Sequence, residues 1–537
     1  MNNKKLILNA FVACSVGTLA ACSSSSDSTS TASPTSETPT TSSTIVGSIF
    51  AAPVNGADVS VKDMGGNTVA GPVMTNADGS YSIDVPDSAL AFDLVFESTG
   101  GVFDDEATDA AGIGTDAGSL SALVAGGSLD ATSSVHVTPG TTIHADLVTD
   151  YGKTATDAKT AFFTAFAYNP DFTIQPVDVT EPAALTANDL SRLSGFRALV
   201  FSQLAQNLGL TAAQQFDMFA ALAQDLSDGT LDGVDANGPV AIGASGISLP
   251  ADILSQYIAT AASFTEATTA SYTVQYEPSG MTTHGKDTFS LTITDGSGLP
   301  VTGLVDNGSL SLMPMMYMND MMHSTPMGGI TESASGVYDV IIYYLMPSRM
   351  MDGTTMGTWD LKVNIGSESA HFYPNVQMAM MTNTVRVQLK GINDTIIDMN
   401  GLEVPRTYNL FRDRLATLDG DNNDEFDVFI APIETMTSFP ALIDGMTLMS
   451  GMGGDPYLVD GITVEASVND GTFVAGIDNG NGTWSFTGLT LNSGTGMEPV
   501  ANTICVRLTV SGETKTTVDA EGNTVDCGTF TVTLPSM

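Results

Sequence analysis

The sequence has 537 residues and a formal net charge of −43, from 60 acidic and 17 basic side chains. This acidity argues against a nucleic acid partner, because phosphate binding needs clustered lysine and arginine. No nucleophile elbow, zinc-protease, phosphate-loop or dinucleotide motif occurs, and there are only five histidines, so we expect no enzymatic activity.

The N-terminus is typical of an exported protein. Lys4 and Lys5 precede a short apolar run over 6–19, which ends in Leu-Ala-Ala-Cys at Cys22. This order resembles a bacterial lipobox. The resemblance implies a lipoprotein signal peptide over 1–21, a lipid on Cys22 that anchors the chain to a membrane, and outer-membrane localisation, because Ser23 follows. The alternative is an ordinary signal peptide with a chance cysteine.

Two segments follow the signal. Residues 22–44 are almost entirely Ser, Thr and Pro, which predicts a disordered tether. Residues 45–130 form the first predicted domain, whose first half, up to about residue 95, alternates as strands do. Asp78-Gly79 predicts a turn before Tyr81 and Ile83 on one strand face. The Pro-Val-Asn-Gly-Ala stretch at 53–57 and this turn resemble the carboxypeptidase regulatory-like domain, which implies a small β-sandwich and no catalysis.

Residues 131–268 change to helical periodicity. Alanine-rich stretches at 154–168 and 186–210 place apolar residues three and four apart. Thr211 and Gln214 form a capping-box pattern before the next such stretch. We therefore predict one α-helical domain inserted among β-domains.

The remainder reads as β-structure with turn residues between short β-branched and aromatic runs. It divides into a Met-rich immunoglobulin-like domain over 269–395, a less regular connecting segment over 396–454, and a second immunoglobulin-like domain over 455–537. The predicted fold class is thus multidomain and mainly β, with immunoglobulin-like β-sandwiches and the helical insertion. Cys505 and Cys527 lie in neighbouring strand-like runs of an exported chain, which predicts a disulfide worth about 3 kcal/mol.

Methionine is concentrated in the Met-rich domain. Fourteen of the 26 methionines fall between 313 and 381, together with two of the histidines. If 310–323 is one extended strand, Met313, Met315 and His323 share one face and Met316 and Met322 the other. A sandwich buries only one of these faces, so we expect many of the sulfurs to lie outside the core.

Thioethers are soft, neutral donors that select Cu(I), and imidazole adds affinity for Cu(II). We therefore predict a copper site, with methionine packing in the core as the alternative. The candidate ligands are Met313, Met315, Met316, Met318, Met321, Met322, His323, Met346, Met350, Met351, Met356, His284 and His371.

The Met-rich domain also resembles the YtkA-like family of exported immunoglobulin-like modules, some of which handle copper. The similarity lies in the Met-Pro-Met strand that ends at His323, in Gly-Val-Tyr-Asp-Val at 336–340, and in Met346 followed by Gly-Thr-Trp-Asp-Leu at 357–361. The resemblance implies copper handling, whereas the extra methionines and an insertion between Met346 and Trp359 depart from the pattern.

One acidic segment resembles a calcium loop, with oxygen donors at Asp419, Asp421, Asn423 and Glu425. The glycine of an EF-hand loop is absent, which favours a solvated acidic turn over calcium. The leading hypothesis is a lipid-anchored, extracytoplasmic metal-binding protein that favours Cu(I). The alternative is a non-enzymatic structural or adhesive surface lipoprotein whose methionines are packing.

Overall fold

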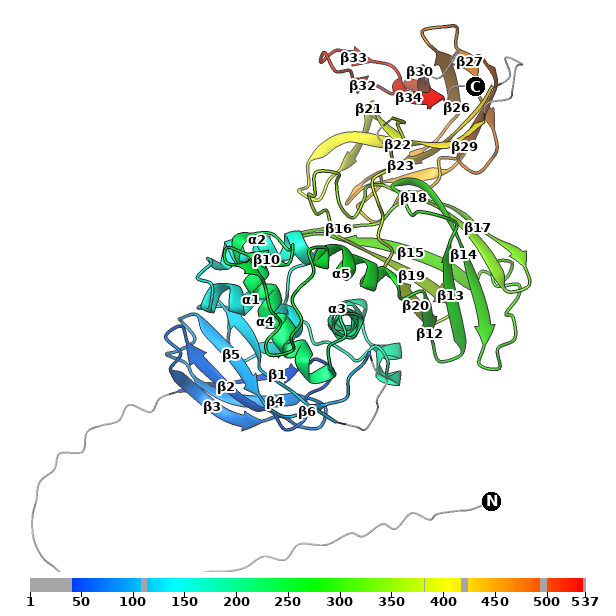
Figure 1. The fold of residues 1–537 in the computed structure, drawn as a ribbon. Helices are drawn as coiled ribbons and strands as arrows, with labels where there is room; N and C mark the ends of the chain where they lie inside the picture. The colour runs from blue at the N-terminus through cyan, green and yellow to red at the C-terminus, as the bar shows by residue number, and fades with distance from the viewer. Residues whose placement is uncertain (1–40, 108–113, 381, 417–423, 493–499, 535–537) are drawn as a thin grey trace, which may run out of the picture. The chain divides into compact units, whose positions relative to one another are not determined.

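The computed structural model describes residues 41–107, 114–380, 382–416, 424–492 and 500–534. The predicted signal peptide and the tether up to residue 40 lie outside these ranges, as do Cys22, Asp419, Asp421 and Asn423. The described strands form three β-sandwiches, and the helices follow the first of them in the chain (Figure 1). The predicted fold class, mainly β with immunoglobulin-like sandwiches, is confirmed.

The first sandwich pairs a sheet of order β4-β1-β9 with a sheet of order β3-β2-β5-β8. The predicted turn is present, since Gly79 donates its N–H to the Asn76 carbonyl at 2.9 Å, and Tyr81 and Ile83 are buried. The strands are β1 (Ser42–Ile49), β2 (Asp58–Asp63), β3 (Thr68–Met74), β4 (Ser80–Pro86), β5 (Leu94–Thr99), β6 (Val102–Phe103), β7 (Thr115–Asp116), β8 (Leu120–Val124) and β9 (Ser134–Val137).

The helices share one hydrophobic core with the first sandwich, in which Phe162 and Phe201 pack with strand residues such as Val61 and Phe96. The capping box is present, since the Thr211 N–H donates to Gln214 Oε1 at 2.9 Å. No helix among the described residues is long and apolar enough to cross a membrane. The elements are α1 (Pro139–Thr149), α2 (Ala155–Phe166), η1 (Pro182–Thr186), α3 (Asp189–Asn207), η2 (Ala212–Gln214), α4 (Gln215–Asp225), η3 (Leu226–Asp228), β10 (Val234–Asp235), β11 (Gly238–Pro239) and α5 (Ile253–Ala262).

The Met-rich sandwich pairs a five-stranded sheet, β12-β13-β14-β18-β17, with a four-stranded sheet, β16-β15-β19-β20. Its core contains side chains from both sheets, among them Tyr276, Tyr338 and Trp359. The strands are β12 (Glu266–Thr268), β13 (Tyr272–Pro278), β14 (Gly285–Asp295), β15 (Leu310–Tyr317), β16 (Met322–His323), β17 (Met327–Ala334), β18 (Val337–Tyr344), β19 (Thr358–Ile365) and β20 (Glu368–Phe372).

The C-terminal sandwich is larger than the sequence analysis predicts. Residues 403–416 and 424–432, inside the expected connecting segment, are two long central strands of its first sheet, and residues 386–397 are the edge strand beside them. The strands are β21 (Arg386–Ile397), β22 (Glu403–Ala416), β23 (Asp424–Pro432), β24 (Thr447–Ser450), β25 (Gly454–Leu458), β26 (Ile462–Val468), β27 (Val474–Ala475), β28 (Ile477–Asp478), β29 (Thr483–Leu489), β30 (Val500–Val510), β31 (Glu513–Thr514), β32 (Thr517–Val518), β33 (Thr524–Val525) and β34 (Gly528–Leu534).

The predicted disulfide between Cys505 and Cys527 is present, with Cα atoms 5.6 Å apart and the two cysteines separated by 22 positions in sequence. Cys505 lies in β30, and Cys527 directly precedes β34, which pairs with β30. The bond therefore joins two neighbouring strands of the same sheet.

Candidate metal site in the Met-rich sandwich

The methionine run does not form one extended strand. The chain reverses after β15, where the Met318 N–H donates to the Met321 carbonyl at 2.9 Å, and returns as β16. Met316 therefore lies opposite His323, and Tyr317 lies opposite Met322. The predicted assignment of faces is wrong for this reason, because the turn puts His323 on the face of Met316 instead of the face of Met313.

His323 is a buried imidazole whose hydrogen bonding fixes its tautomer. The side chain is 3% exposed, and Nδ1 lies 2.7 Å from the Ser324 carbonyl oxygen. Since a carbonyl only accepts, Nδ1 carries the proton and Nε2 of the neutral ring keeps its lone pair. Nε2 has no hydrogen-bond partner among the described residues. Burial lowers the pKa of His323, against a smaller opposing effect of the Ser324 hydrogen bond.

Sulfur and aromatic groups surround this face of the sheet. Met316 is fully buried and lies between His323 on one neighbouring strand and Trp359 on the other. The Trp359 ring meets His323 edge-on at 5.4 Å between centroids, and its Nε1–H donates to the Met346 carbonyl at 3.2 Å. The half-buried methionines that pack against the same core are Met318, Met327, Met346 and Met356.

The opposite face of this sheet carries a different group of predicted ligands. Met315 is buried there opposite Asp360, and Met313 is 43% exposed opposite Lys362. His371 lies on this face too, because it pairs with Lys362, and its Nδ1 is 2.9 Å from Asp360 Oδ1. The sheet therefore separates His371 from His323.

The turn between β15 and β16 exposes two more of the predicted ligands. Met321 is 48% exposed and Met322 is 52% exposed. Their side chains contribute little to the core, and Met322 points away from the face on which His323 lies.

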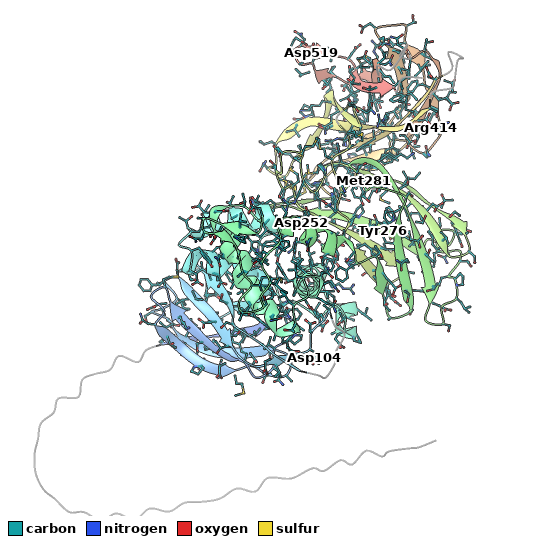
Figure 2. The ribbon with its side chains drawn as sticks, viewed as in Figure 1. Asp104, Asp252, Tyr276, Met281, Arg414 and Asp519 are labelled. Atoms are coloured by element: carbon teal, nitrogen blue, oxygen red, sulfur yellow. A yellow bond between two sulfur atoms is a disulfide. The ribbon has the colours of Figure 1, made fainter. Side chains whose placement is uncertain are left out.

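The remaining predicted ligands lie beside a separate groove of about 700 Å³. Met350 and Met351 line it together with Met281 and Met378, two residues that the sequence analysis did not select (Figure 2 labels Met281). Met281 lies outside the methionine-rich range 313–381, so only the fold brings it here. The groove is therefore lined by four thioethers from three segments.

His284 lies next to the chain segment that borders this groove, but its hydrogen bonding differs from that of His323. Its Nδ1 accepts the Ala379 backbone N–H at 2.9 Å, so the neutral ring carries its proton on Nε2. Neither nitrogen of this tautomer offers a free lone pair. Burial also lowers the pKa of His284.

Among the described residues, we find no group of three or more His, Cys, Asp or Glu side chains that could hold a metal ion. Of the four residues of the calcium-like segment, Glu425 is described, and its carboxylate lies 2.7 Å from Arg414. The other three donors lie outside the described ranges. The observation that bears most directly on metal binding is thus the free lone pair of His323 beside Met316.

No family model matches the chain, and no curated protein matches it. Among solved structures, domains 4–9 of the surface layer protein SbsC align at 14% identity and a TM-score of 0.15, over 49% of this chain and 31% of that one. A chimeric titin Z1Z2 tandem aligns at 10% identity and a TM-score of 0.12, over 49% and 99%. A tetra-tandem repeat of a large adhesion protein aligns at 10% identity and a TM-score of 0.12, over 93% and 100%.

Proposed function

We propose that this protein is an extracytoplasmic, lipid-anchored Cu(I)-binding protein and that His323 and Met316 are the centre of its metal site. One observation carries the proposal. His323 is held by its Nδ1–H on a backbone carbonyl, and its buried Nε2 lone pair faces no donor among the described residues. A metal-ligating histidine is usually held in this way, with the second nitrogen fixed by a carbonyl or carboxylate.

The donor chemistry supports Cu(I) over other ions. An imidazole and thioethers are neutral, soft ligands, which suit a monovalent soft cation better than Zn²⁺ or a hard ion. Met316 lies directly opposite His323, where Cβ atoms of paired residues are about 4.5–5.5 Å apart. Met318 and Met346, which pack against the same core, are the additional thioethers that we assign to the site. The ion would be held there without deprotonation of any ligand.

The binding experiment uses the full chain with Cu(I) kept reduced by ascorbate and competed against a Cu(I) chelator. Met316→Leu and His323→Gln test the site, because Leu for Met is nearly volume-conserving and costs under about 1.5 kcal/mol. Met322→Leu, on the exposed side of the same hairpin, is the matched control. We expect the first two variants to lose at least tenfold in affinity and the control to bind like the parent.

A second readout is the fluorescence of Trp359, the aromatic neighbour of His323. The chain has two tryptophans, so Trp484→Phe leaves Trp359 as the sole reporter. Cu(I) should quench this fluorescence in the parent and not in Met316→Leu. If both site variants bound Cu(I) and were quenched like the parent, the methionines would serve only as packing. That result would favour the alternative, a structural or adhesive lipoprotein. The burial of Met315 and Met316 is the observation that supports this alternative.

The anchor part of the proposal has its own test. The Leu-Ala-Ala-Cys order at Cys22 is the basis of the expectation. Cys22→Ser should leave the signal uncleaved or release the protein from the membrane fraction, as read by fractionation and intact mass. Unchanged processing and membrane partitioning would contradict the lipid anchor without affecting the copper experiment.

A further inference from the structure

A group of four charged side chains, three of them buried, lies inside the C-terminal sandwich. Asp394 is at its centre and is 4% exposed. Its Oδ1 accepts from Arg406 Nε at 2.9 Å, and its Oδ2 accepts from the Tyr408 hydroxyl at 2.5 Å and from Lys515 Nζ at 3.2 Å. Both carboxylate oxygens are thus held in place by donors from other strands or from the segment after β31.

Lys515 is fully buried, which is unusual for a lysine. Its Nζ also lies 2.8 Å from Glu513 Oε1, and the Tyr408 ring centroid is 5.2 Å away. The Glu513 carboxylate is fixed in turn by the backbone N–H groups of Ile392 and Asn393, at 2.9 and 2.8 Å. A second carboxylate is therefore held against the same amine that contacts Asp394.

Two features of this arrangement favour chemistry as well as ion pairing. The amine and the carboxyl group are held in contact in a site that excludes water, and such fixed proximity greatly raises the effective concentration of two reacting groups. Burial of the Asp394–Lys515 ion pair also carries a desolvation cost that its mutual attraction barely offsets. A reaction that removes both charges would remove that cost.

We propose that Lys515 and Asp394 condense to an intramolecular isopeptide bond, a modification that is independent of the copper proposal. The new bond joins Lys515 Nζ to Asp394 Cγ, and the Cγ–Oδ2 bond breaks. The ammonium gives up two protons, which leave with Oδ2 as one molecule of water, so no oxidant, reductant or activating group is needed. Arg406 and Glu513 remain as one cation and one anion, and the site stays electrically neutral.

The neighbours have distinct roles in this step. Glu513, 2.8 Å from Nζ, accepts the proton that frees the amine for attack on Cγ and returns it to the leaving oxygen. Arg406 stabilises the negative charge that develops on Oδ1, to which its Nε already donates. The Tyr408 hydroxyl donates to Oδ2, the oxygen that leaves. The product ties the edge strand β21 to the segment after β31, 121 residues further along the chain.

Peptide mapping of the native full-length chain tests the proposal directly. The purified protein is denatured, its disulfide is reduced and alkylated, and it is digested with trypsin. We expect a branched peptide whose mass equals the two peptides that carry Asp394 and Lys515 less one water, with no cleavage after Lys515. Linear peptides that end at Lys515, with no branched species, would overturn the proposal and leave the group as a buried ion-pair network.

The chain offers a matched internal control in the same digest. Lys286 and Asp413 are 2.7 Å apart, closer than the proposed pair, but their side chains are 26% and 12% exposed. We expect no branched peptide at this more accessible pair. A branch there would show that condensation occurs during sample handling, and it would overturn the assignment of the reaction to the buried site. Lys515→Arg should abolish the branch while keeping the charge.

Glu513→Gln tests the proton-transfer role separately. It should lower the branched fraction at least tenfold, with Trp484 fluorescence as the check that this sandwich still folds. A full cross-link in Glu513→Gln would overturn the assigned role of Glu513.

Discussion

Truncation of Met316 and Met322 to alanine tests the hairpin on which the metal-site proposal depends. Met316 is fully buried between Trp359 and His323, whereas Met322 is 52% exposed. Removing a fully buried methionine side chain leaves a cavity and costs about 2–5 kcal/mol. A half-exposed methionine outside the core should change the free energy of unfolding by less than about 0.5 kcal/mol. The expected difference between the two variants is therefore at least about 1.5 kcal/mol.

The assay follows urea unfolding of the Met-rich sandwich through Trp359, in a Trp484→Phe background. Trp359 is 1% exposed and lies within the core of that sandwich, so its emission reports loss of that core. The midpoint should fall for Met316→Ala and stay near the parent value for Met322→Ala. Equal losses in the two variants would refute the reasoning, because they would mean that 313–323 buries both faces as one extended strand.

Two further predictions concern helix α1 and the C-terminal sandwich. Burial raises the pKa of Asp146 to about 7, with a smaller contribution from Asp150, so the folded state holds a proton that the unfolded state releases near pH 4. As the pH rises from 4 to 7, the parent should lose up to about 4 kcal/mol of stability relative to Asp146→Asn. Thermal unfolding followed by helical circular dichroism measures the stability of both proteins at each pH. The same dependence of stability on pH in the two proteins would contradict this prediction. Cys505→Ser should lower the stability that Trp484 reports by about 3 kcal/mol, and an unchanged urea midpoint would contradict the expected loss.

The sequence predicted most of the fold because its local signals agree with its tertiary structure. The capping box at Thr211 and Gln214 and the turn at Asp78-Gly79 both form at the predicted positions. Alternating β-branched and aromatic residues located the strands of the Met-rich sandwich, and the two cysteines located neighbouring strands. These signals depend on a few adjacent residues, so they can be read without knowledge of distant contacts.

The connecting segment was misjudged because its strands bury polar side chains. Arg406 and Asn409 are fully buried in β22, where a period-2 apolar pattern would place hydrophobic residues. Arg406 Nε donates to Asp394 Oδ1 from β21 at 2.9 Å, and Asn409 Oδ1 accepts from Arg386 Nη1 at 3.0 Å. Buried polar groups of this kind become visible only when their partners on neighbouring strands are known.

The proposed metal site shows the same limit in a sharper form. Thioethers and imidazoles that are adjacent in sequence alternate between the two faces of a strand, so abundance in a run does not bring ligands together. One turn at 318–321 decides that His323 shares a face with Met316. The pairing of β19 with β20 places His371 on the other face, where it contacts Asp360. The composition of the run predicted which metal its side chains suit. The register of three strands determines which pair of side chains we propose as its ligands. The decisive experiment therefore compares Met316 with Met322 instead of removing methionines together.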